Sequence, residues 1–161
     1  MNIELSYIRC ENIDKVVDLV ERRLNGNLRE ITAQIPEEIP DSYEVYLQNN
    51  KKRKVAVSQP KEGWITVVES KEVNDYTMLL AISKELNTDV ISLAQYDTVG
   101  TWGYVEIHSG NIKSCYFSDE DDAIEELITQ IRNKNNITES MILFREAVQK
   151  KGGGWKVIQA R

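Results

Sequence analysis

The stretch that decides the fold is Trp102-Gly-Tyr-Val-Glu-Ile-His-Ser-Gly-Asn-Ile-Lys-Ser-Cys-Tyr-Phe117, because it holds two strand-like runs and the turn between them. The turn is Ser109-Gly-Asn111, where glycine accepts the positive φ that a tight hairpin requires. We therefore predict two paired strands, 102–108 and 112–117. In this register we expect Tyr104 to face Phe117, Glu106 to face Cys115, and His108 to face Lys113.

The residues that follow the hairpin are typical of the start of a helix. Ser118 is a suitable N-cap, and the acidic run 119–122 would occupy the first turn. Carboxylates in a first turn interact favourably with the exposed backbone amides and with the helix dipole. An apolar stripe runs from Ala123 to Ile131, so we predict a helix over 119–132.

Before the hairpin, the apolar pattern changes several times between the periods of strands and helices. Alternating apolar residues predict a strand over 3–10. Asn12 and Gly26 bound an amphipathic helix, 12–25, and Asn74 or Asp75 opens another, 74–87. Short runs rich in β-branched residues predict further strands at 55–58, 64–68 and 90–94. After 132 we predict a helix that starts at Thr138, with Met141, Phe144 and Val148 buried, and a last strand over 155–158.

The order strand, helix, strand, strand, helix, strand is that of a ferredoxin-like α+β fold, followed here by an extra hairpin and helices. We predict one mostly antiparallel sheet, with helices 12–25, 74–87 and 119–132 packed on one face. The whole chain, 1–161, is expected to form a single domain, in which 133–161 is a C-terminal helix–strand extension.

Length and composition agree with a single folded domain. The 161 residues are 41% hydrophobic and 29% charged, which is enough for one core and argues against general disorder. No apolar run approaches the roughly 20 residues of a membrane span, and no secretory signal is visible. The two cysteines make no disulfide framework, so we expect a cytoplasmic protein with reduced thiols.

The net charge of −6 argues against nucleic-acid binding, because backbone phosphates require lysine and arginine. The basic cluster at 51–54 is interpreted as a solvated turn. An acidic surface favours a basic protein as partner.

Two sets of residues are candidates for a binding site. Aromatic side chains on predicted strands would line a cleft for a small ligand; they are Trp64, Tyr96, Trp102 and Tyr104. Carboxylates close to the hairpin would bind a divalent cation in the alternative that the protein is a metal-dependent enzyme; they are Asp97 and Glu106.

No catalytic motif is convincing. His108 and Cys115 are predicted to lie diagonally on the hairpin, too far apart for a base to activate a thiol. The glycines at 152–154 follow a helix, whereas a phosphate-binding loop precedes one.

The sequence therefore predicts a non-catalytic binding module, an adaptor or inhibitor that recognises a protein through an acidic face or a sheet edge. A small-ligand-binding regulatory domain and a metal-dependent hydrolase are the alternatives. We expect no cofactor, no nucleic acid and no membrane as partner, and a homodimer through the edge or face of the sheet.

Overall fold

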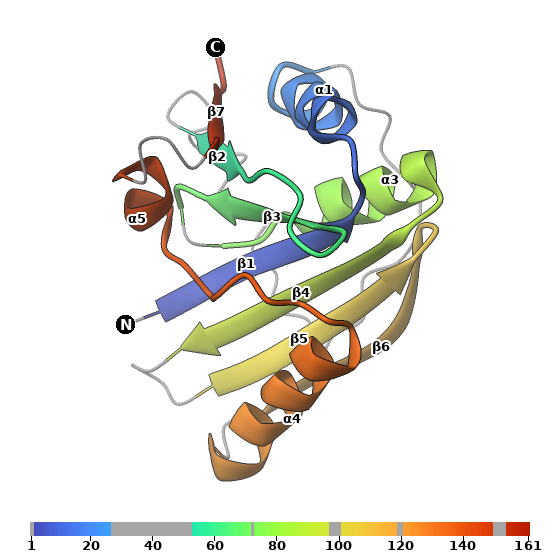
Figure 1. The fold of residues 1–161 in the computed structure, drawn as a ribbon, viewed down its shortest axis with the longest axis vertical. Helices are drawn as coiled ribbons and strands as arrows, with labels where there is room; N and C mark the ends of the chain where they lie inside the picture. Colours follow the sequence, from blue (N-terminus) through green and yellow to red (C-terminus); the bar gives the residue numbers. More distant parts are fainter. Residues whose placement is uncertain (1, 27–52, 72, 97–100, 119–120, 150–153) are drawn as a thin grey trace.

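The computed structural model describes residues 2–26, 53–71, 73–96, 101–118, 121–149 and 154–161, and Figure 1 shows how they are arranged. The elements are β1 (Asn2–Arg9), α1 (Ile13–Leu24), β2 (Lys54–Val57), β3 (Trp64–Glu69), α3 (Tyr76–Leu86), β4 (Asp89–Tyr96), β5 (Thr101–His108), β6 (Asn111–Ser118), α4 (Asp121–Lys134), α5 (Phe144–Gln149) and β7 (Lys156–Gln159).

The strands form one seven-stranded sheet in the order β6-β5-β4-β1-β3-β2-β7, and every neighbouring pair is antiparallel. The first strand lies in the middle, between β4 and β3. The β5–β6 hairpin extends the sheet beyond β4, and β7 extends it beyond β2. The predicted α+β class with an antiparallel sheet is confirmed.

Helices α1 and α3 cover one side of the sheet, which we call the first face. Val57, Ile65 and Ile107 of the sheet pack there against apolar residues of both helices, such as Val20 and Leu80. The nearly all-round apolar character of α3 is explained by its position, because seven of its residues are buried.

The opposite side, the second face, is covered by α4, α5 and the segment between them (Figure 1). Leu5 and Tyr7 of β1 point to it, whereas Ile8 points to the first face, as the alternation of a strand requires. The core of the second face also contains Trp64, Val68, Ile91, Leu93, Ile128, Ile131 and Ile142.

The prediction that helix 119–132 shares a face with the other two helices is therefore wrong. An apolar stripe shows that a helix must be buried, but it does not select the side of the sheet. Here the central strands are apolar on both sides, and α1 and α3 already occupy the first face. A chain with two apolar sheet faces needs a second layer of helices to cover the other one.

Local signals at the helix ends are confirmed. The Asn12 side chain accepts a hydrogen bond from the Asp14 N–H at 3.0 Å, and Asp75 accepts one from the Met78 N–H at 3.1 Å. Asn87 closes α3 in the left-handed conformation, with φ of 48°. Each cap satisfies backbone groups that the helix itself leaves without partners.

The hairpin forms as predicted, but its register differs by one residue over most of its length. The turn consists of Ser109 and Gly110 alone, so His108 lies opposite Asn111 instead of the predicted Lys113. A bulge after Glu106 then makes Lys113 an extra residue on β6, which places Tyr104 opposite Tyr116 and Glu106 opposite Ser114. A shift of one residue exchanges the two faces of a strand. Cys115 and Phe117 consequently pack against the core of the first face.

The C-terminal part differs from the prediction in its helix. The chain from 135 to 143 crosses the second face without forming a helix, and α5 starts only at Phe144. Val148, predicted to be buried, is 44% exposed, whereas Ile142 and Leu143 are buried instead. The predicted last strand is confirmed as β7, which pairs with β2.

Candidate functional site

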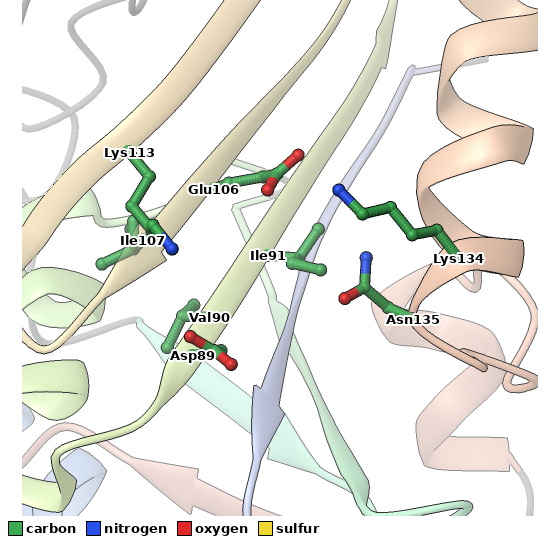
Figure 2. Close-up of a pocket in the computed structure, with 8 residues that line it drawn as sticks. All are labelled: Asp89, Val90, Ile91, Glu106, Ile107, Lys113, Lys134 and Asn135. Carbon is green, nitrogen blue, oxygen red and sulfur yellow. The ribbon is translucent and has the colours of Figure 1, made fainter.

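A cavity of about 220 Å³ opens on the second face, between the hairpin, β4 and the end of α4 (Figure 2). We call it the charged pocket, because four of its lining side chains are ionisable. Its lining residues are Asp89, Val90, Ile91, Glu106, Ile107, Lys113, Lys134 and Asn135.

The register of β4 and β5 places the acidic residues. Asp89 lies opposite His108, and Ile91 lies opposite Glu106. Because alternate residues of a strand share a face, these four side chains form one square on the sheet. Asp89 and Glu106 occupy diagonal corners, roughly 7–8 Å apart.

Asp89 already has a partner within this square. One of its carboxylate oxygens lies 2.5 Å from Nδ1 of His108, and both side chains are about half exposed. The contact fixes the orientation of the imidazole ring. It also leaves Glu106 as the pocket's second carboxylate, with no comparable neighbour.

The two lysines reach the pocket from different elements. Lys113 is the extra residue of the β6 bulge, and a bulge commonly turns a side chain to a new direction. Lys134 is the last residue of α4. Figure 2 shows Lys113 and Lys134 on opposite sides of Glu106, with Lys134 extending from the helix toward the Glu106 carboxylate.

The charged ends of Glu106, Lys113 and Lys134 take part in no ion pair and no side-chain hydrogen bond within the described part of the chain. Surface charges without partners are common one by one. Three of them around one cavity, of both signs, form a site at which a charged ligand finds opposite charges.

A second group of charged residues lies buried on the first face, and its members form ion pairs with one another. The Arg53 guanidinium bonds Glu69 at 2.5 and 3.0 Å and Asp75 at 3.0 Å, and Arg23 bonds Asp75 at 2.9 Å. Asp75 also caps α3. These buried charges are engaged with one another, so we interpret them as part of the scaffold.

Of the four aromatic candidates, Trp64 is 1% exposed and lies in the core of the second face. Its indole N–H donates to the backbone oxygen of Asn135 at 2.8 Å, and the Arg9 guanidinium lies 5.4 Å from the ring centre. Trp64 thereby anchors the chain just after α4, at a residue that lines the charged pocket.

The structure describes the other three aromatic candidates to different extents. Tyr104 is half-buried and packs against the core of the second face. Tyr96 ends β4 and Trp102 lies in β5, but the positions of their side chains are outside what the structure describes.

Of the two residues predicted to bind a metal ion, the structure describes only one. Glu106 lines the charged pocket, whereas Asp97 lies outside the described residues. No group of three or more His, Cys, Asp and Glu side chains placed to hold a metal ion occurs in the described ranges. His108 and Cys115 do not pair, because the register places them opposite Asn111 and Val105.

Sequence reasoning missed Asp89, Lys113 and Lys134. Asp89 lies between the predicted helix 74–87 and the predicted strand 90–94, although it is the first residue of β4. The one usable signal was the spacing of polar residues two apart, Glu106 and His108, on an otherwise apolar strand. Lys134 comes into the site only because α4 covers the second face.

No family model matches this chain, and no curated protein or solved structure is significantly similar to it. In the part of the chain that is described, no helix has the length and apolar character needed to cross a membrane. The interpretation of the charged pocket therefore depends on its own geometry.

Proposed function

We propose that the protein is a non-catalytic binding module and that its ligand occupies the charged pocket. The observation that carries the proposal is the set of charges of both signs, Glu106, Lys113 and Lys134, that surround one cavity without pairing to one another. A folded chain gains from pairing such charges when geometry allows, and a bound ligand can supply the missing partners.

Binding without catalysis is supported by the chemistry of the pocket. The Asp89–His108 pair resembles the orienting half of a nucleophilic triad, but the lining includes neither serine nor cysteine. The hydrolase alternative would need a metal held by Asp97 and Glu106, and only Glu106 has a described place in the pocket.

A ligand screen followed by thermal unfolding tests the proposal. A ligand that binds only the folded state at 100 times its Kd stabilises it by about 2.7 kcal/mol, so the Tm should rise by several degrees. The double variant Glu106→Gln/Lys134→Met should lose this rise. The control Glu85→Gln/Lys15→Met removes the same charges from exposed positions of α3 and α1 and should retain it.

A ligand that raises the Tm of the pocket variant as much as that of the wild type would contradict the proposal, because it would bind elsewhere. Amide chemical shifts locate the ligand independently. The largest changes are expected in β4, β5 and the last turn of α4.

A protein ligand is the second candidate, supported by the end strand β6 and its 47% exposed Tyr116. A partner segment could add to this edge of the sheet, as in other modules that bind extended peptides. The net charge of −6 favours a basic partner. The affinity for this partner should then fall as the salt concentration is raised. An affinity that does not depend on salt would contradict electrostatic recognition.

We further infer a ferredoxin-like relationship for the central part of the fold. Support comes from the order β1–α1–β2–β3–α3–β4 of the described elements, and from the neighbouring positions β4-β1-β3-β2 in the sheet. The β5–β6 hairpin and β7 are then additions at the two edges, and the charged pocket belongs to the added part. We also propose a cytoplasmic location and a homodimer formed through the sheet, as expected from the sequence.

A further inference from the structure

We propose that the ligand of the charged pocket is a compact zwitterion, a molecule of amino-acid size that carries one primary amine and one carboxylate. This inference rests on the proposed function of the pocket as a ligand site. It uses the signs of the free charges, the size of the cavity and the character of its floor.

The signs of the free charges select against a ligand with a single charge. Glu106 offers one carboxylate, and Lys113 and Lys134 offer two ammonium groups. A simple anion would meet both lysines but also Glu106, whose like charge repels it. A simple amine would meet Glu106 but be repelled by both lysines. A zwitterion can pair its amine with Glu106 and its carboxylate with a lysine.

Asp89 limits where the amine is held. One of its carboxylate oxygens contacts His108 at 2.5 Å. Asp89 therefore adds negative potential to the pocket, but its two oxygens are not both available to bind the amine. Glu106 lies at the diagonal corner of the same square. We therefore place the amine of the ligand at Glu106 and its carboxylate at the ammonium group of Lys134, while Lys113 adds positive potential from the other side of Glu106.

The size of the cavity excludes large ligands. Its volume of about 220 Å³ is below the roughly 300–1,000 Å³ of typical cofactor and drug sites. The buried Ile91 forms an apolar part of the floor, and Figure 2 shows it between the acidic side chains and the Lys134–Asn135 end of α4. A short methylene chain between the two charged groups fits this surface.

The test is calorimetric titration of the wild-type protein with a series of ω-amino acids: glycine, β-alanine, 4-aminobutyrate and 6-aminohexanoate. Each compound is compared with the amine and the carboxylate of the same chain length. We expect one member of the series to bind at least tenfold more tightly than both of its singly charged counterparts. Amide shifts should place it at β4, β5 and the end of α4.

Two variants test the contacts of the ligand's amine and of its carboxylate separately. Glu106→Gln should reduce the affinity for the zwitterion to that for the plain carboxylate, and Lys134→Met should reduce it to that for the plain amine. Glu85→Gln and Lys15→Met are the matched controls and should leave the affinity unchanged.

The outcomes separate this inference from the proposed function. If plain carboxylates bind in the pocket as tightly as zwitterions, the pocket is an anion site. The proposal of a zwitterionic ligand is then wrong, while the proposed binding function stands. If none of these compounds binds and a ligand from the screen raises the Tm of the pocket variant equally, both proposals fail.

Discussion

Tyr7 shows how a single residue connects the sheet to the layer above it. Its ring lies in the core of the second face, and its hydroxyl donates to the backbone oxygen of Glu139 at 3.1 Å. Burial raises the pKa of Tyr7 to about 12, and the neighbouring Glu139 acts in the same direction, while Arg132 opposes the shift. The folded protein therefore holds the phenolic proton more tightly than the unfolded chain does.

This shift predicts a dependence of stability on alkaline pH. The contribution of Tyr7 is fully present below its ordinary pKa of 10.0 and is lost as the pH rises toward about 12. Between about pH 9 and about pH 11.5 the wild type should lose about 2 kcal/mol more unfolding free energy than Tyr7→Phe. Urea unfolding at both pH values measures the difference. Equal losses in the two proteins would show that Tyr7 is not the responsible group.

At the scale of elements, the hairpin depends on the contact of a glycine with an aromatic ring. Gly103 on β5 lies opposite Phe117 on β6, and the ring of Phe117 lies over the space that a side chain at 103 would use. A Cβ there would approach Phe117 Cγ to 2.6 Å. Glycine in a strand often marks such a close approach.

Gly103→Ala should therefore destabilise the protein by about 1–3 kcal/mol, the usual cost of overpacking a filled core. Phe117→Leu removes the ring, so the double variant Gly103→Ala/Phe117→Leu should lose less than the sum of the two single changes. Denaturant unfolding of the four proteins in this cycle measures the coupling. Strict additivity would mean that the two residues do not compete for space.

The elements also show what the sequence can predict. The ends of α1 and α3 follow from Asn12, Asp75 and Asn87, because a cap acts on amides within the same turn. The hairpin follows from Gly110, but its register does not, because Asn111 belongs to β6 instead of the turn and the bulge at Lys113 depends on packing against two faces at once. The charged pocket depends on three strands and α4 together, so Glu106 was predicted for another reason and Lys134 was not predicted at all.

At the scale of the whole molecule, a buried ionic network joins elements that are far apart in the chain. Arg53, just before β2, bonds Glu69 at the end of β3 and Asp75 at the start of α3, and Arg23 connects α1 to the same carboxylate. Arg53 is 2% exposed and Glu69 1%. Removing one member leaves the others as buried charges, which is strongly unfavourable.

Arg53→Met should lower the unfolding free energy by about 3–5 kcal/mol. Lys54→Met, at the exposed neighbouring position, is the control and should change it by less than about 0.5 kcal/mol. Adding Glu69→Gln to Arg53→Met should recover part of the loss, because it removes one of the uncompensated charges. Urea unfolding at neutral pH is the measurement. A loss below about 1 kcal/mol in Arg53→Met would show that the network contributes little.

The bulge on β6 also affects how readily the protein can aggregate through the edge of its sheet. An end strand that is flat and regular offers its backbone to the same strand of another molecule, and such pairing can continue into fibres. Here an unpaired lysine interrupts the eight-residue end strand, and β7 at the opposite end has only four residues. We therefore expect both ends of the described sheet to disfavour the repeated pairing that builds fibres, even in concentrated solutions of the protein.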